Sequence, residues 1–261
     1  MAITSELRED HIRVVTMEHG KVNALPVADW FGVGEALDEA GRDGATRVVV
    51  LRAEGRDFNA GVDIKEMQNT SGFDAILGAN PGCYAAFKAI YECPVPVIAA
   101  VNGHCIGGGV GLVGNADVVV ASDDAYFSVP EVNQGALGAA THMARLVPQH
   151  MMRSLYFTAG KIPATQLEQY GSVYRTVPRA MREIAPERID EAALEIARTI
   201  ASKNPKVIRA AKEAINGIDP VDVNKSYRFE QGFTFELNLK GVADELRDDF
   251  AGTTKATDAG R

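Results

Sequence analysis

Short β-rich runs alternate with longer helical patterns through the first two thirds of this 261-residue chain. Three of the β-rich runs are dense in Val or Ile, and turn-forming residues bound them. Helical patterns lie between them, among them Val27–Ala40 and Phe73–Glu92. This alternation predicts an α/β fold built from stacked ββα or βαβ units. The four runs are His11–Thr16, Arg47–Arg52, Val95–Val101 and Asp117–Ala121.

From Gln149 onward the pattern is helical almost to the end of the chain. An amphipathic helix over Ala185–Ser202 is followed by Lys206–Asn216 and Val221–Phe250, with a break at Gly217–Pro220. We therefore expect residues 1–200 to form the α/β core and residues 201–261 to form a helical C-terminal region of the same domain. Aromatic residues in the last helix predict core or oligomer contacts; they are Tyr227, Phe229, Phe233 and Phe235.

Charge and composition exclude several kinds of partner. The formal net charge is −8, from 27 basic and 35 acidic residues, which argues against a nucleic-acid surface. The longest apolar stretch, Val95–Val101, is too short to span a bilayer, and the polar start carries no signal peptide. The cysteines, Cys83, Cys93 and Cys105, are odd in number and lack metal-ligand spacing. These features predict a cytoplasmic protein with reduced core thiols, no membrane partner and no metal.

Two glycine-rich segments each follow a predicted strand. Phe58–Met67 comes after Arg47–Arg52, and Asn102–Gly111, which contains a glycine triplet, comes after Val95–Val101. Glycines between a strand and a helix leave backbone N–H groups uncovered, which suits a developing oxyanion or a phosphate. Either segment alone is equally consistent with a tight turn that allows close packing.

Together the two segments resemble the crotonase (enoyl-CoA hydratase/isomerase) superfamily, and the resemblance runs from about Ile12 to Phe250. It implies a spiral of ββα units with a helical C-terminal oligomerisation region, assembled as a homotrimer or a dimer of trimers. It also implies an acyl-coenzyme A thioester as substrate, with no prosthetic group. The backbone N–H groups of Val62 and Gly108 match the oxyanion hole of that family.

The same resemblance implies contacts with coenzyme A. Lys21 and the segment around Ala24 match an early loop beside the pantetheine and phosphates, while Lys21 is equally well read as a solvated surface lysine. Phe250 matches an aromatic residue that reaches a neighbouring subunit's cofactor, although Thr253 replaces the family's lysine there. The adenine-reading backbone matches Ala60, Asp63 and Ile64.

The chain departs from the family's hydratases at the first of two glutamates. Gly111 occupies that position, whereas Glu131, in the motif Phe127–Glu131, matches the second. Adding water across a double bond needs coordinated acid and base groups, so one carboxylate is a poor set for hydration. It suffices to move one proton or to activate one water. The alternative reading of Glu131 is a surface carboxylate near a helix start.

The stretch after Glu131 is also altered, and it reads Ala136–His142. The resemblance places His142 near the start of a helix that borders the acyl pocket. A histidine there is a candidate base or hydrogen-bond donor, and a structural histidine is the alternative. Weaker candidates are His104, Asn133 and Gln134.

Several phrases of the chain together resemble the ring-opening hydrolases of late steroid (cholesterol C/D ring) degradation within the superfamily. The leading hypothesis is hydrolytic retro-Claisen cleavage of a cyclic keto-acyl-CoA, with Glu131, alone or with His142, activating water. The alternatives are an enoyl-CoA hydratase or Δ3,Δ2-isomerase of fatty-acid or sterol side-chain β-oxidation, and a non-catalytic acyl-CoA-binding scaffold. The phrases are FNAGVDIKEMQ, GGGVGLVGN, ALGAATH, LVPQH, VIRAAKEAI and EQGFTFELN.

Overall fold

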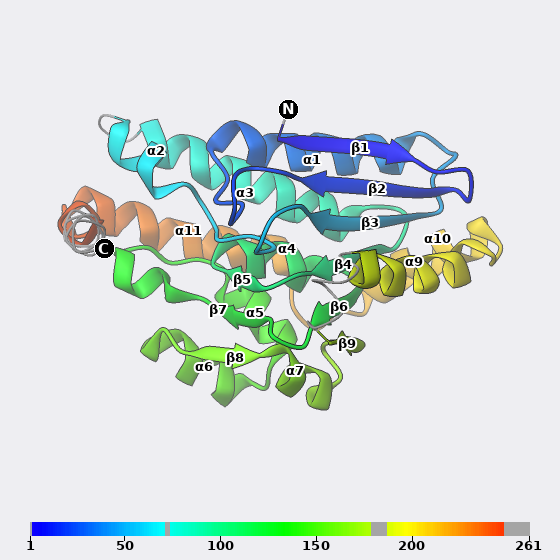
Figure 1. Cartoon of the computed structure of the whole chain (residues 1–261). Helices are drawn as coiled ribbons and strands as arrows, with labels where there is room; N and C mark the ends of the chain where they lie inside the picture. Colours follow the sequence, from blue (N-terminus) through cyan, green and yellow to red (C-terminus); the bar gives the residue numbers. More distant parts are fainter. Residues whose placement is uncertain (1, 71–73, 179–186, 248–261) are drawn as a thin grey trace.

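A six-stranded sheet forms the centre of the computed structural model, which describes residues 2–70, 74–178 and 187–247 (Figure 1). β1 pairs antiparallel with β2, and every later pairing in this sheet is parallel. In sheet order the strands are β1 (Ile3–Leu7), β2 (Ile12–Met17), β3 (Val48–Ala53), β4 (Val97–Val101), β6 (Val118–Ser122) and β9 (Arg175–Val177). A second, smaller sheet contains β5 (His104–Ile106), β7 (Tyr126–Ser128) and β8 (Lys161–Pro163).

Helices surround the two sheets. In chain order they are α1 (Val27–Arg42), α2 (Ile64–Asn69), α3 (Asp74–Glu92), α4 (Gly108–Asn115), the 3-10 helix η1 (Pro130–Gln134), α5 (Ala140–Leu146), α6 (Gln149–Thr158), α7 (Ala164–Tyr170), α9 (Glu187–Ala201), α10 (Pro205–Gly217) and α11 (Val223–Leu239). In the part of the chain that the structure describes, no helix is long and apolar enough to cross a membrane.

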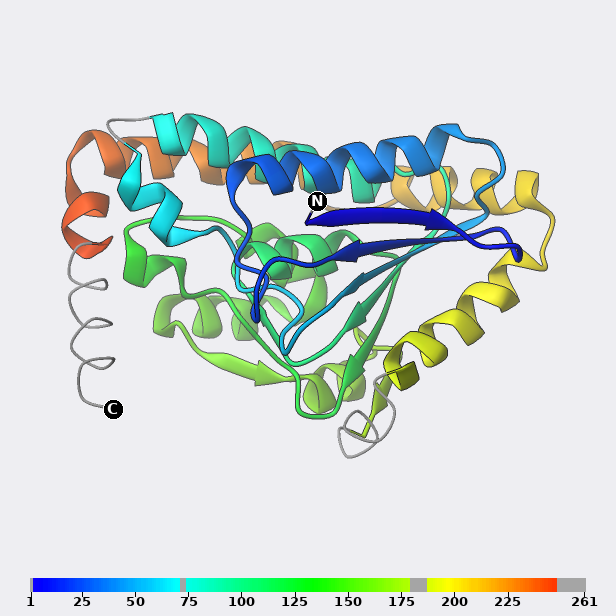
Figure 2. The ribbon, with the colours of Figure 1, turned by 45° about the horizontal axis from the view of Figure 1, so that its top comes forward.

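The main sheet is covered on both faces because its strands are apolar on both sides. Val49 and Leu51 of β3 pack into the core that contains α1 and α3. Their neighbours Val48 and Val50 point the other way, into a second core formed with α9. Figure 2 shows α9 on the opposite side of the sheet from α1 and α3. Side chains alternate along a strand, so a continuous run of valines buried on both faces is typical of a parallel sheet between helices.

The four strands predicted from sequence are confirmed to within two residues as β2, β3, β4 and β6. The region after Gln149 was expected to be helical almost throughout, and that expectation is wrong in two places. The three-residue strands β8 and β9 lie there, held by pairing with β7 and β6. Strands this short carry too few residues for a detectable alternation.

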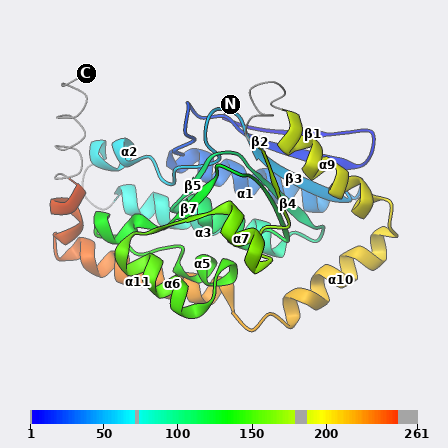
Figure 3. The same cartoon turned by 60° about the horizontal axis from the view of Figure 1, so that its bottom comes forward.

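The predicted helix Val221–Phe250 is also corrected. It ends at Leu239, and Gly241 has a φ of +75°, so the backbone turns there before helix resumes over residues 242–247. α11 lies beside α3 and α5, as Figure 3 shows. This helix is therefore packed against elements of the core.

Candidate active site

The two glycine-rich segments meet at the ends of the parallel strands β3 and β4. Asn59 joins them, because its carbonyl accepts the N–H of Ile106 at 2.8 Å and its side-chain oxygen accepts the N–H of Gly61 at 2.8 Å. The Asn59 amide also donates to the carbonyl of Asn23 at 2.8 Å. Parallel strands end at the same edge of a sheet, and open α/β sheets bind ligands at that edge.

Two backbone N–H groups are left uncovered at this junction. The N–H of Leu25 donates to the carbonyl of Gly61, and the N–H of Asp63 donates to the carbonyl of Leu25, both at 2.9 Å. The N–H of Val62, which lies between these two bonds, therefore faces the other way. Gly108 is the first residue of α4, where an N–H has no acceptor in its own helix. Within the described residues, neither N–H donates to another protein group.

The two N–H groups are also close in space. A methyl group on Gly61 would stand 3.4 Å from the nitrogen of Gly108. A methyl group on Gly108 would stand 2.7 Å from the buried ring of Trp30 and 3.6 Å from Cα of Gly61. Together, two neighbouring donors backed by a buried apolar ring form a suitable place for one anionic oxygen.

Glu131 lies at the same junction. A methyl group on Gly107 would stand only 2.6 Å from Oε1 of Glu131, and Gly107 also has a φ of +58°, so only glycine is compatible with this approach. Oε2 is buried and accepts no hydrogen bond from the described residues. Burial, and then the charge of Glu230, raise the pKa of Glu131 to about 8. A carboxylate with one unpaired oxygen and a raised pKa is suited to accept a proton.

The groups around Glu131 were not found from the sequence. The charge of Glu131 contributes to raising the pKa of Cys83, Tyr156 and Tyr227, after burial as the larger cause. Glu230 contributes to the raised pKa of Glu131 itself. These groups come from α3, α6 and α11, so no local motif joins them. The one available signal was that Glu230 begins the phrase EQGFTFELN.

The space beside Gly111 is closed by an aromatic ring. A methyl group on Gly111 would stand 2.1 Å from Cζ of Phe87, so the ring fills the volume that any side chain at 111 would need. Phe87 in turn makes edge contacts with Trp30 and His142, at centroid distances of 5.8 and 4.8 Å. The chain has therefore replaced the missing carboxylate with apolar packing.

His142 is fully buried between Phe87 and Tyr227, whose ring centroids lie 4.8 and 5.1 Å from its own. Neither ring nitrogen has a hydrogen-bond partner among the described residues. Burial, together with the positive charge of Arg145, lowers the pKa of His142 to about 3. The imidazole is therefore neutral near pH 7 and a weak base, and no hydrogen bond joins it to Glu131.

The residues expected to contact coenzyme A differ in their exposure to solvent. Lys21 is exposed, and Ala24, Ala60 and Ile64 are half-buried. Asp63 is half-buried too, and its side chain caps α2 by accepting the N–H of Lys65 at 2.9 Å. Phe250 lies outside the described residues.

The weaker candidates are placed elsewhere or left unpaired. His104 packs against Tyr126 at a centroid distance of 4.2 Å and lies 3.3 Å from Asp57. Asn133 is exposed, whereas Oε1 of Gln134 is buried and has no partner among the described residues.

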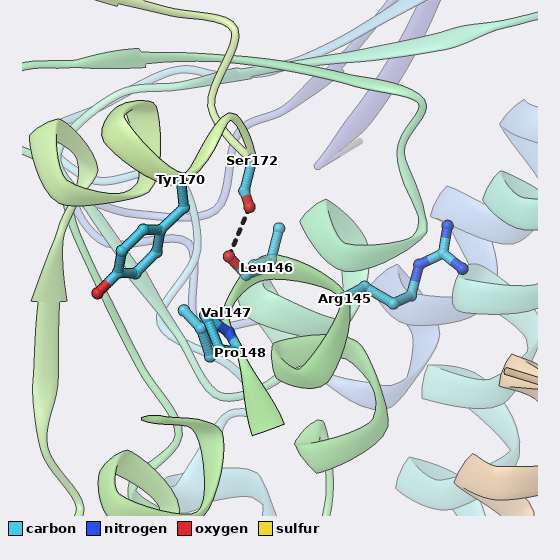
Figure 4. Close-up of a pocket in the computed structure, with 6 residues that line it drawn as sticks. All are labelled: Arg145, Leu146, Val147, Pro148, Tyr170 and Ser172. Carbon is cyan, nitrogen blue, oxygen red and sulfur yellow. Dashed lines mark hydrogen bonds between the residues drawn. The ribbon is translucent and has the colours of Figure 1, made fainter. Parts of the chain in front are cut away.

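A separate pocket of about 280 Å³ lies between the C-terminal ends of α5 and α7 (Figure 4). Figure 4 shows Arg145 pointing away from the other lining residues, and Ser172 donating to the carbonyl of Leu146 at 2.6 Å. None of its lining residues is a predicted site residue. Over the described ranges, no three His, Cys, Asp or Glu side chains gather in a way that could hold a metal ion.

Comparison with known proteins places this site in a family. Residues 8–234 match the profile of the enoyl-CoA hydratase/isomerase family. The chain is 62% identical over 255 residues to the (7aS)-7a-methyl-1,5-dioxo-2,3,5,6,7,7a-hexahydro-1H-indene-carboxyl-CoA hydrolase of Rhodococcus jostii, covering 98% of this chain and 96% of the relative. It is 61% identical to the Mycobacterium tuberculosis protein of the same name, covering 96% and 98%.

More distant relatives share the fold. A carnitinyl-CoA dehydratase of Salmonella heidelberg is 30% identical, over 85% of this chain and 83% of the relative. The crystal structure of an enoyl-CoA hydratase/isomerase from Xanthobacter autotrophicus Py2 superposes with a TM-score of 0.84 at 23% identity, covering 98% and 93%. The profile match and the extent of these similarities lead to one conclusion: this chain belongs to the enoyl-CoA hydratase/isomerase (crotonase) family.

Proposed function

We propose that this enzyme opens a ring of a bicyclic diketo-acyl-CoA in steroid degradation by hydrolytic carbon–carbon cleavage. The observation that carries the proposal is the single raised-pKa carboxylate, Glu131, beside two uncovered N–H donors, with Phe87 in place of a second carboxylate. The name shared by the two relatives above 60% identity supplies the substrate class.

The chemistry of such a substrate selects the bond that breaks. In a 1,5-dioxo-2,3,5,6,7,7a-hexahydroindene the remaining double bond joins C3a and C4, conjugated with the C5 ketone. Cleavage of C1–C7a leaves an electron pair on C7a, next to that conjugated system. We place the carboxyl-CoA group on C4, since only there does its carbonyl join the same conjugated path.

The proposed reaction then balances with one water. Glu131 takes a proton from water as the oxygen attacks C1. The C1–C7a bond breaks, and its electron pair moves through C3a and C4 onto the thioester oxygen, held by the N–H groups of Val62 and Gly108. Glu131 returns the proton to C7a, giving a carboxylate side chain and an intact thioester. Loss of one oxyanion donor typically costs about a hundred- to a thousandfold in rate.

His142 acts as a neutral hydrogen-bond donor in this proposal, and not as the base. With its pKa lowered to about 3, the imidazole is a poor proton acceptor. One of its nitrogens carries a hydrogen in the neutral state, and neither nitrogen has a partner among the described residues. A ring ketone of the bound substrate would provide that partner.

The substrate's coenzyme A portion binds, in this proposal, along Lys21, Ala24, Ala60, Asp63 and Ile64. The protein would be cytoplasmic, as its three free, buried cysteines suggest. It would assemble as a homotrimer or a dimer of trimers through exposed apolar side chains on the last helices. Those side chains are Val207, Ile215, Ile218, Phe229, Phe233 and Leu239.

The test is a comparison of two bicyclic substrates that differ only in the C3a–C4 double bond. The unsaturated diketo thioester should be opened, because C7a is then conjugated with the carbonyl groups. The saturated analogue should be inert, since the same cleavage would leave a carbanion without stabilisation. Opening of both substrates at similar rates would refute this route. Rapid hydration of crotonyl-CoA would instead favour the hydratase alternative, which the retained Glu131 supports.

A further inference from the structure

The segment that follows Glu131 is held in place by one helix far along the chain. The carboxylate of Glu230, on α11, accepts the N–H of Ala140 at 3.0 Å through Oε2. Its Oε1 accepts the N–H of Thr141 at 2.7 Å and also the hydroxyl of Thr141. Ala140 and Thr141 begin α5, so Glu230 caps that helix from outside.

One turn further along α11, Thr234 makes a second attachment to the same segment. Its hydroxyl accepts the N–H of Leu137 at 2.9 Å and donates to the carbonyl of Leu137 at 2.7 Å. Between these two attachments, the N–H of Gly138 donates to the hydroxyl of Tyr156 at 3.1 Å. Residues 137–141 are therefore fixed to α11 at both ends and to α6 in the middle.

This attachment matters because the first N–H groups of α5 would otherwise lack hydrogen-bond acceptors. Ala139, the residue before α5, has a φ of +61°, an unfavourable conformation for a residue with a side chain. Its own side chain gives α5 no cap. The buried Glu230 carboxylate supplies the missing acceptors, and it brings His142, which follows directly, against Phe87 and Tyr227.

We propose that Glu230 is a positioning residue for the active site: it clamps residues 137–141 to α11 and sets the electrostatic environment of Glu131. The proposal rests on the ring-opening function above. Both oxygens of Glu230 accept hydrogen bonds from Ala140 and Thr141, so its proposed role is to position the segment and not to react.

The electrostatic part follows from the groups that face Glu131. They are Cys83 from α3, Tyr156 from α6, and Tyr227 and Glu230 from α11. Cys83, Tyr156 and Tyr227 have raised pKa values, so they are uncharged near neutral pH. Burial is the first cause of the raised pKa of Glu131, and the negative charge of Glu230 adds to it. Burial also raises the pKa of Glu230 itself, while its hydrogen bonds from Thr141 and Ala140 act in the opposite direction.

The test compares Glu230→Gln with two other variants. Glutamine offers one acceptor oxygen, so at least one of the N–H groups of Ala140 and Thr141 loses its partner. Thr141→Val keeps the charge and both backbone bonds and removes only the hydroxyl bond. The matched control is Glu236→Gln, which removes one charge from an exposed side chain on the same helix, paired with Lys240.

Two measurements are made on each full-length variant. In Glu230→Gln, hydrogen exchange of the amides of Ala140 and Thr141 should accelerate, and kcat for ring opening should fall by about ten- to a hundredfold through misplacement of the site. Loss of the negative charge lowers the pKa of Glu131, so the acidic limb of kcat/KM should move to lower pH. Thr141→Val removes only the hydroxyl bond, so it should reduce kcat less than Glu230→Gln does, and Glu236→Gln should match wild type.

Wild-type exchange and an unchanged pH profile in Glu230→Gln would overturn the proposal, as would equal effects in Glu236→Gln. Should Glu230→Gln fail to fold, Thr234→Val decides the clamp, because it removes both hydrogen bonds to Leu137. Unchanged exchange of the 137–142 peptide in that variant would contradict the clamp. A wild-type enzyme that opens no ring would refute the proposed function alone, because the exchange experiment would still report on the clamp.

Discussion

Among single residues, Glu131 has the largest part in the proposed reaction. Its Oε2 is buried without a donor, and its pKa is raised to about 8, mainly by burial. As a base it must be deprotonated before it can accept a proton from water. We therefore predict that kcat/KM rises about tenfold per pH unit up to about pH 8 and then levels off.

The measurement is kcat/KM for ring opening between about pH 6 and about pH 10, with Glu131→Gln as the inactive comparison. A profile that is flat over this range would contradict the assignment. So would an acidic limb at the ordinary glutamate pKa of 4.5.

A second residue-scale prediction concerns stability and His142. Its pKa is lowered from 6.5 to about 3 on folding, so the unfolded chain takes up a proton first as pH falls. Its contribution to stability is complete above pH 6.5 and is lost progressively below it. At about pH 5 the loss should reach about 2 kcal/mol. His142→Leu should therefore lose less stability than wild type between about pH 7 and about pH 5, by that amount.

Urea unfolding at the two pH values measures this difference directly. Equal pH dependence in the two proteins would show that His142 is not buried in its neutral form. The same variant should lose ring-opening activity, because leucine cannot donate to a substrate ketone.

Glu131 and His142 were predicted as site residues from the sequence, but their surroundings were not. Glu131 stands in a contiguous motif, Phe127–Glu131, and a motif of that length can be read directly from a sequence. The burial of the His142 ring depends on Phe87 and Tyr227, and the cap on α5 depends on Glu230. These partners come from α3 and α11, and nothing local in the sequence indicates which side chains from distant helices will meet.

At the scale of elements, α3 and α4 are fitted together at Gly111 and Phe87. A methyl group on Gly111 would stand 2.1 Å from the Phe87 ring, and both elements are part of the main core. We predict that Gly111→Ala destabilises the protein by about 1–3 kcal/mol through overpacking. The double variant with Phe87→Ala should be more stable than the two single effects predict, because the added methyl group then has space.

The free energy of urea unfolding is the measurement, and Gly217→Ala is the matched control. An added methyl group on Gly217 meets nothing within 4 Å, so this change should be neutral or slightly stabilising. Additive effects of Gly111→Ala and Phe87→Ala would contradict the contact.

Long elements were predicted from the sequence more successfully than short ones. The valine-rich strands β3 and β4 and the long helices α1 and α3 have enough residues for a clear pattern. The three-residue strands β5 and β8 are defined by pairing across the small sheet, which a local pattern does not report. Elements of this second sheet precede α4 and η1, so sequence alone did not explain how Gly107 and Glu131 come together.

At the scale of the whole molecule, the exposed apolar residues of the last helices predict association between copies of the chain. Ile218 is 81% exposed and Phe229 is 70% exposed, values that are unfavourable for large apolar side chains in a monomer. Sedimentation equilibrium should give three or six times the chain mass. Ile218→Asp and Phe229→Asp should weaken the assembly, whereas Leu77→Asp, also exposed but on α3, serves as a comparison. A monomeric wild-type protein would contradict the proposed assembly.

The proposed reaction uses water to cleave a carbon–carbon bond. It neither adds water to a double bond nor hydrolyses the thioester. The most direct test is mass spectrometry of the bicyclic diketo thioester after turnover in ¹⁸O-labelled water, with Glu131→Gln as the control for exchange of the ketone oxygens. We expect an intact coenzyme A thioester with label in a new carboxylate side chain formed from C1. Released coenzyme A, or label on a ring hydroxyl with both rings closed, would contradict it.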